Sequence, residues 1–491
     1  MALAVVLSGT FLANLDSFIV VVALPALKLG LGASEGEQEL VLVGYQLAFG
    51  MGLITGGRLG DHFGFVRVFA FGMGVFTVAS VGCGLAPFAG FLVAARLAQG
   101  AGTSLMVPQA FRAAQSLFSG GARRRAFAVT GTVMGVGAVS GQLLGGWLLA
   151  ADVYGLGWRA VFLVNVPMGA AAFAALPWAA AAERERARRN ERGSVPRNLD
   201  ERVAAWPPAR LQLDLPGTCL AALALGLFMT PMVIGGTAGV SWWSLALLVA
   251  PAAAGFLRYE RAVERRGGRP LLPSELLRCP GFGRGLALVA LANCGLSSFI
   301  LTLGLLLQEG LGWRPLATGA GMLPAAVAFA LTSLLTPAWK VSQRRLLGWA
   351  AAVSASGYLG CAAAVVFGEV RWLLVAVGVA GAGLGLLVAP ALAFTLKGVP
   401  EHVAGAGAGV VATAQQCAAA LGVCAFGALF FALVDTGTDI PTAFAAVTVA
   451  IAATAVLAGW LTAGIRSAPD SARGRRVPAA RGGPGDADDL L

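Results

Sequence analysis

Two charged side chains interrupt long apolar runs of this chain. Asp16 lies in the apolar stretch 15–25, where a charge costs about 2.5–3.5 kcal/mol on insertion scales and usually faces a cavity. Removal from water favours the neutral acid, so Asp16 could bind and release a proton. The alternative is a structural Asp that bonds to Asn14 or to a neighbouring helix.

Arg96 lies within another apolar segment, at 91–111. Arginine remains protonated in proteins, so inside a helix it needs carboxylates, carbonyls or water as partners. A carboxylate such as Asp16 is one possible partner. Alternatively, Arg96 snorkels to the surface or pins two helices together.

A glycine-rich loop at 57–67 carries charges of both signs. Its glycines let the chain reverse direction quickly, and its Asp and Arg side chains can form charge pairs at the cytoplasmic face. A plain connecting turn is the alternative. The residues of interest are Gly57, Arg58, Asp61, Gly64 and Arg67.

The segment 126–150 has small residues at helical spacing. Gly137, Gly141 and Gly145 are four residues apart, which permits very close helix packing; Gln142 and Gly146 belong to the same stretch. Other amide side chains lie in apolar segments, where they could line a substrate cavity or act only as links between helices. They are Asn14, Gln46, Gln109, Asn293, Gln308 and Gln415.

Composition requires a lipid environment for these residues. The 491 residues are 57% hydrophobic and 12% charged, whereas soluble domains are about 25% charged. The 68 glycines suit helices packed in lipid. The net charge of +11 resides in loops, which favours membrane topology over nucleic-acid binding.

The sequence predicts no metal, cofactor or enzyme centre. His62 and His402 are far apart and the seven cysteines are scattered, which gives little support to a zinc site. The Gly-Lys-Ser/Thr loop of nucleotide-driven proteins does not occur, so an ion gradient is the expected driving force. We also expect a monomer.

Spanning helices need about 20 apolar residues, and the chain offers about fourteen such runs, which predicts an all-α integral membrane protein. They are 2–27, 38–57, 68–88, 91–111, 126–150, 160–182, 214–235, 242–259, 284–308, 316–338, 346–367, 371–396, 404–434 and 440–465.

The basic residues predict that both termini are cytoplasmic. With that orientation, 30 of the 35 Lys and Arg residues lie on the inside, as the positive-inside rule requires. The exceptions are Lys28, Arg159, Arg314 and Arg371 in outer loops, and Arg96. Acidic residues, which carry less weight in the rule, fall in outer loops or at their edges; they are Glu35, Glu37, Glu39, Asp152, Glu309, Glu369, Asp435 and Asp439.

The long charged stretch after the sixth run divides the chain into repeated units, a plan common among transporters. We expect an N-terminal six-helix bundle at 1–182, a charged cytoplasmic linker at 183–213 and an extra helix pair with its loop at 214–283. A C-terminal six-helix bundle at 284–465 and a disordered cytoplasmic tail at 466–491 would follow.

Several of these stretches, in this order, resemble motifs of the 14-spanner drug:proton antiporters of the major facilitator superfamily. Residues 15–25 resemble the first-helix motif, with Phe18 and Val22 at two polar positions. Residues 57–67 resemble the loop between the second and third helices, and 96–102 the Arg-x-x-Gln-Gly-x-Gly motif. Residues 137–146 resemble the antiporter motif, with Gln142 in place of proline; 157–167, 307–313 and 321–324 resemble further segments.

The resemblance implies a major facilitator fold and proton-coupled export of a drug or antibiotic across the cytoplasmic membrane by alternating access. It assigns Arg96 to proton coupling beside Asp16, and the loop 57–67 to conformational gating. A proton-coupled importer of a small metabolite is a rival interpretation, because the fold does not fix direction. A membrane-embedded enzyme or a non-transporting receptor is a second.

Overall fold

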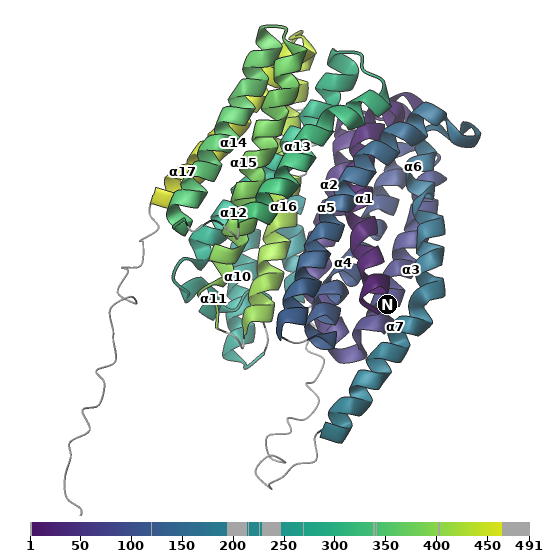
Figure 1. Ribbon diagram of the computed structural model, residues 1–491, viewed down its shortest axis with the longest axis vertical. Coiled ribbons are helices and arrows are strands. Elements are labelled where there is room, and N and C mark those ends of the chain that lie inside the picture. The colour runs from purple at the N-terminus through teal and green to yellow at the C-terminus, as the bar shows by residue number, and fades with distance from the viewer. Residues whose placement is uncertain are drawn as a thin grey trace, which may run out of the picture.

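The computed structural model describes residues 2–118, 120–193, 214, 216–224, 226–227, 247–268, 270–336, 339, 341–400 and 403–463. Every regular element within these residues is a helix. Figure 1 shows the helices as two groups that stand side by side, one formed by the first part of the chain and one by the last.

The first group contains long helices joined by short turns. Its elements are α1 (Ala2–Leu31), α2 (Glu35–Phe63), α3 (Phe65–Gly84), α4 (Ala89–Leu117), α5 (Gly120–Ala151), the 3₁₀ turns η1 (Val153–Gly155) and η2 (Gly157–Arg159), α6 (Ala160–Leu163) and α7 (Asn165–Gly193). Ser34 begins α2 in a capping box with Glu37, which satisfies backbone donors at the start of the helix. Gly64 turns the chain into α3 with φ +88°, a conformation that suits glycine.

The second group is also built mainly from long helices. Its elements are α10 (Val249–Arg265), the short α11 (Ser274–Arg278), α12 (Phe282–Leu305) with the π-helical turn η4 (Leu306–Gly310), α13 (Pro315–Leu335), α14 (Gln343–Val366), α15 (Val370–Leu396), α16 (Ala404–Asp435) and α17 (Ile440–Ala463).

Eleven helices of the described chain are long and apolar enough to cross a membrane. The expected run 91–111 is not among them. It forms α4, which is long enough, but its polar side chains, Arg96 and Gln99 among them, lower its mean hydropathy. These two side chains are buried against neighbouring helices rather than exposed to lipid. The described part therefore gives a multi-pass helical membrane fold without confirming fourteen spans.

The central part of the chain differs from expectation at one boundary. The linker was expected from residue 183, but α7 continues to Gly193, and 194–213 lies outside the described residues. Residues 228–235 of the expected run 214–235, the start of 242–259 and the tail 466–491 also lie outside them. Helix α10 forms the later part of the expected run 242–259. It has 17 residues and ends in charged sequence.

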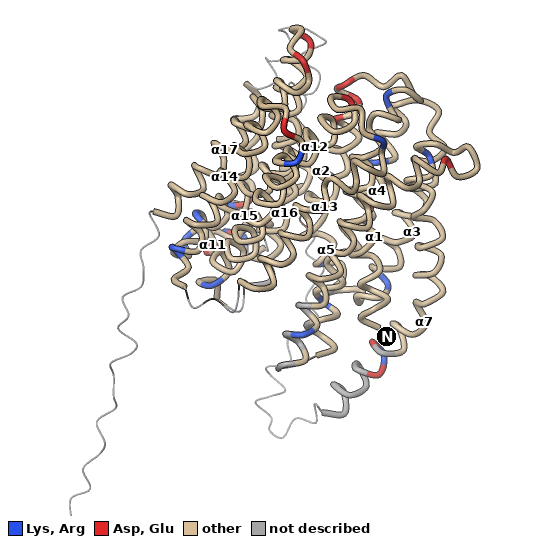
Figure 2. The backbone as a smooth tube through the Cα atoms, turned by 45° about the horizontal axis from the view of Figure 1, so that its top comes forward, with Lys and Arg blue, Asp and Glu red and all other residues tan. Residues whose placement is uncertain are grey.

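The bundle has two distinct ends. We call the end at which α7 finishes and α12 begins the linker end, and the end with the turns 32–34, 152–159, 311–314, 367–369 and 436–439 the hairpin end. Figure 2 shows Asp and Glu in several turns of the hairpin end, with further acidic residues near α11 and along the last part of α7.

The largest core that the two groups share lies toward the hairpin end. One buried cluster there combines side chains of α1, such as Leu24, with side chains of η4 and α16, such as Leu306 and Phe430. Two smaller buried clusters lie toward the linker end. One is centred on Phe69 of the first group and is contacted by Ala412 of α16; the other is centred on Leu347 of the second group and is contacted by Ile54 of α2. Apolar packing therefore joins the halves more firmly at the hairpin end.

Candidate functional site

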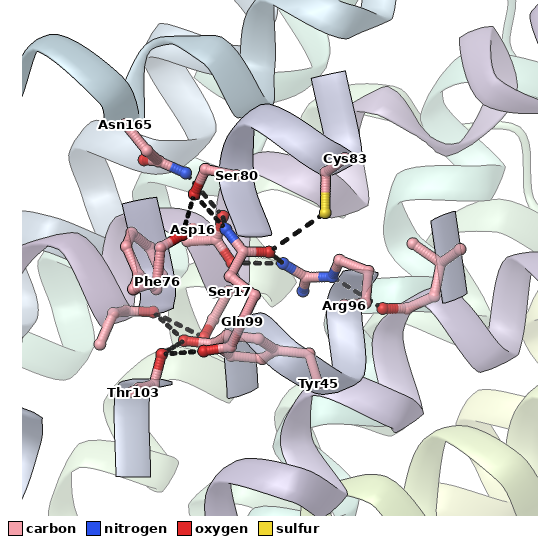
Figure 3. A network of polar contacts seen from close by, with 12 residues as sticks. Asp16, Ser17, Tyr45, Phe76, Ser80, Cys83, Arg96, Gln99, Thr103 and Asn165 are labelled. Atoms are coloured by element: carbon pink, nitrogen blue, oxygen red, sulfur yellow. Dashed lines mark hydrogen bonds and ion pairs between the residues drawn. The ribbon is translucent and has the colours of Figure 1, made fainter. Parts of the chain in front are cut away.

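Asp16 and Arg96 meet inside the first helix group. Arg96 Nη1 donates a hydrogen bond to Asp16 Oδ2, and the two side chains form an ion pair. Both are shielded from solvent, with 0% of Asp16 and 1% of Arg96 exposed. Figure 3 shows them at the centre of a network of polar contacts. The partner proposed for Arg96 from the sequence is thus the one it has.

Two amide side chains complete the surroundings of the carboxylate. Gln99 Nε2 and Asn165 Nδ2 each donate to Asp16 Oδ1 at 2.8 Å. Gln99 also donates to Ser80 Oγ at 2.9 Å and accepts from Arg96 Nη1 at 2.7 Å. One network therefore links α1, α3, α4 and the start of α7 (Figure 3).

Arg96 has further partners that do not involve the carboxylate. Its Nε donates to the Val41 carbonyl oxygen at 3.0 Å, and its guanidinium carbon lies 4.2 Å from the centre of the Tyr45 ring. Tyr45 in turn donates to the Ala13 carbonyl oxygen at 3.1 Å. A cation over an aromatic face is stabilised by about 0.5–2 kcal/mol, so Arg96 keeps a place on α2 even if Asp16 becomes neutral.

The hydrogen bonds indicate which form of Asp16 this arrangement holds. Arg96, Gln99 and Asn165 all donate to its oxygens, and a protonated carboxyl would bring a proton of its own that needs an acceptor. Asn165 Oδ1 is such an acceptor, because it is buried and without a hydrogen-bond partner. The geometry therefore fits the carboxylate, while rotation of the Asn165 amide would let it fit the acid.

The glycines of α5 hold α1 in place at this site. A Cβ on Gly137 would lie 2.7 Å from the Phe11 carbonyl oxygen, and one on Gly145 would lie 2.8 Å from Ile19 Cγ1. Gly141 faces the Leu15 carbonyl in the same way, directly beside Asp16. These three glycines lie where α5 approaches α1 most closely. Gly146 instead faces the backbone of Pro315 in the second group, and Gln142 is buried with Oε1 unpartnered.

The loop 57–67 is the end of α2 and the turn into α3. Arg58 Nη2 donates to the Pro270 carbonyl oxygen at 2.7 Å, across to the segment before α11. Glu183 of α7 accepts from the Phe65 backbone N–H at 2.8 Å, where a negative charge favours the start of α3. Gly57 has open space around it, Arg67 is exposed and the Asp61 side chain lies outside the described residues.

The six amides proposed as cavity candidates have different surroundings. Asn14 and Asn293 bond to carbonyls of their own helices. Gln109 ties α4 to the Gly56 carbonyl of α2 at 2.9 Å, and Gln308 crosses from η4 to the Val22 carbonyl of α1 at 3.2 Å. Gln46 keeps a buried, unpartnered Oε1, and Gln415 is half-buried on α16.

Gln99 and Asn165 were not assigned a role from the sequence. The spacing of three between Arg96 and Gln99 puts both on one helix face, which could have identified Gln99. Asn165 offers no comparable signal, because its contact with Asp16 joins residues 149 positions apart.

Comparisons with known proteins agree with this architecture. Residues 6–423 match the Major Facilitator Superfamily. The chain is 35% identical over 443 residues to a probable actinorhodin transporter of Streptomyces coelicolor, covering 89% of this chain and 73% of that protein. It is 31% identical over 493 residues to the cephamycin export protein CmcT of Amycolatopsis lactamdurans, covering 95% and 93%.

A solved structure supports the same fold. The peptide transporter POT in complex with sulfate superposes with a TM-score of 0.65 at 14% identity, covering 94% of this chain and 93% of that one. The resemblance to drug exporters stated from the motifs is confirmed by the relatives. The chain belongs to the major facilitator superfamily and is a multi-pass membrane transporter, not an enzyme.

Proposed function

We propose that this transporter exports a small amphipathic or hydrophobic compound, a drug or an antibiotic, in exchange for protons. The observation that carries the proposal is the buried ion pair of Asp16 and Arg96, whose carboxylate is ringed by donors. Charged residues inside spanning helices commonly mark proton or substrate pathways. The named relatives that handle actinorhodin and cephamycin support an antibiotic-like cargo.

The proton step follows from the partners of Asp16. A proton on Asp16 removes the charge that Arg96 neutralises, and the guanidinium keeps the Val41 carbonyl and the Tyr45 ring. Asn165 can then turn its free oxygen toward the new O–H. Protonation would loosen the link between α1 and α4 while each group retains a partner, so one conformation is exchanged for another at modest cost.

Alternating access requires two units that rock against each other. We propose residues 1–182 and 284–465 as these units, with 214–283 as an extra pair to make fourteen spans. The apolar core that the halves share is larger at the hairpin end than at the linker end, which supports a state closed at the hairpin end. The Lys and Arg distribution supports a cytoplasmic linker end and cytoplasmic termini.

The loop 57–67 would act as the conformational gate at the linker end. Arg58 is the residue that supports this role, since its bond to the Pro270 carbonyl links α2 to the segment before α11, which lies between the two proposed units. A second contact between the two units is made by α5 and α13, where Gly146 closely approaches Pro315 and Gln142 closely approaches Gly319.

The test is transport in inside-out vesicles with an imposed pH gradient and a panel of labelled drugs. Wild type should accumulate at least one compound when the interior is acidic, and an uncoupler should abolish accumulation. Asp16→Asn should lose the response to the gradient. Glu369→Gln is the matched control, because Glu369 is exposed and makes no side-chain cap bond.

Each rival interpretation predicts a different result. A proton-coupled importer would accumulate the compound only in right-side-out vesicles. A receptor would move it in neither. Asp16→Asn vesicles that respond to the gradient as wild type does would remove Asp16 from the proton step, and uptake that survives the uncoupler would exclude ion coupling.

A further inference from the structure

A second carboxyl group, Glu39, lies inside the protein at the hairpin end. The sequence placed it at the edge of an outer loop, but α2 begins at Glu35 and Glu39 sits in its second turn with 3% of its surface exposed. Its Oε1 is buried and no described residue forms a hydrogen bond with it. At this edge of α2, α16 covers the side chain.

The group that covers Glu39 belongs to the other half of the transporter. Its Oε1 lies against Gly427 of α16, so closely that a Cβ on Gly427 would overlap it. Leu301 Cδ2 of α12 is 3.5 Å from that same position. Phe430 and Val423 of α16 and Val41 of α2 belong to the buried apolar cluster at this interface. The carboxyl group is therefore shielded by the contact between the two halves.

The charged groups near Glu39 do not offset its charge. Glu35 lies one turn earlier on α2 and is itself faced by Asp435 and Glu309. Lys28 of α1, the nearby cation, is 3.6 Å from Glu35 and pairs with it. On α16 the titratable neighbour is the buried Cys424 thiol. Among the described residues, an ionised Glu39 would have acids, a thiol and apolar side chains around it, and the nearby cation is already paired with Glu35.

The free-energy cost of burying a charge decides the protonation state of Glu39. A buried, unpaired carboxylate costs several kcal/mol, which proteins avoid by neutralising the group. Asp16 differs, because Arg96, Gln99 and Asn165 stabilise its charge. In this one conformation the two carboxyls thus favour opposite protonation states.

We infer that Glu39 is a proton-binding site of the hairpin-end gate, which takes up a proton when α2 closes against α16. The inference rests on the proposed alternating access and adds a site outside the Asp16 network. Opening exposes Glu39 to the solution on the hairpin side, where it can ionise. Closure from that side is therefore linked to proton uptake, and acid there favours the closed gate.

The gate can be followed as a distance in the full-length transporter in lipid nanodiscs. Spin labels at Tyr154 and Phe367, both exposed at the hairpin end, one in each half, report opening by pulsed electron paramagnetic resonance. Cys219, Cys279 and Cys294, the cysteines that are not buried, are replaced by Ser first. The ratio of short-distance to long-distance populations is measured from pH 5.5 to 8.5.

Wild type should shift toward the short distance as the pH falls, by up to about tenfold in the ratio per pH unit for one linked proton. Glu39→Gln should remain at the short distance across the range, because its neutral amide needs no proton. Glu39→Met, apolar and of similar length, should do the same and covers the case in which the Gln variant fails to fold. Glu369→Gln should respond as wild type does.

The failure of this inference can be told apart from failure of the proposed function. Asp16→Asn should lose gradient-driven transport and keep the pH response of the gate. A Glu39→Gln or Glu39→Met gate that responds to pH as wild type does would overturn the assignment, as would a wild-type distance that ignores pH. Neither outcome would change the vesicle result for Asp16.

Discussion

Replacing Gly137 by Ala tests whether α5 sets the position of the Asp16 site. The added methyl carbon would lie 2.7 Å from the Phe11 carbonyl oxygen and 3.1 Å from Asn14 Cβ, where ordinary contacts begin at 3.4 Å. Since a helix backbone is the obstacle, α1 must move by about 0.7 Å, which a close-packed interior resists.

The displacement acts directly on Asp16, two residues beyond Asn14. A shift of that size would stretch the 2.8 Å bonds from Gln99 and Asn165 to about 3.5 Å, where a hydrogen bond is largely lost. Overpacking of this kind costs about 1–3 kcal/mol of stability. Misplacement of reacting groups by about 1 Å can reduce rates by as much as a hundredfold.

Gly135→Ala is the matched control on the same helix. Nothing lies within 4 Å of a Cβ at Gly135, and Gly to Ala in a helix stabilises by about 0.5–1 kcal/mol. Thermal unfolding in detergent should therefore show Gly137→Ala as less stable than wild type and Gly135→Ala as more stable. Gradient-driven efflux should be lost only in Gly137→Ala. Equal stability and equal efflux in the two variants would refute the packing argument.

Two further predictions concern carboxyl groups near the linker end. Burial, and then the Asp214 carboxyl, raise the pKa of Glu260 to about 7; a raised pKa gives stability that is complete below the unfolded value and is lost as pH rises through about 7. Thermal unfolding from pH 4 to 8.5 should show that loss in wild type and a flatter profile in Glu260→Gln, and matching profiles would contradict it. Glu183→Ala should cost about 0.5–2 kcal/mol, as for a lost helix cap, whereas Glu183→Gln keeps an acceptor for the Phe65 N–H; equal melting temperatures for the two would exclude the contact as a cap.

The sequence alone determined the class of protein and its most unusual charges. Long apolar runs commit the backbone to helices, because lipid offers no partners for unpaired N–H and C=O groups. Asp16 and Arg96 were recognisable because each interrupts such a run. The spacing of Gly137, Gly141 and Gly145 was equally legible, since a period of four keeps residues on one face of any helix.

The tertiary structure decided which polar groups meet. Asn165 reaches Asp16 only because α7 packs on α1, and no local pattern records a contact over that separation. The burial of Glu39 could not be predicted for the same reason, since it depends on α16, almost 400 residues later. Composition and periodicity report the preference of a segment for lipid or water, but the surroundings of a single carboxyl group depend on the partner that the fold places against it.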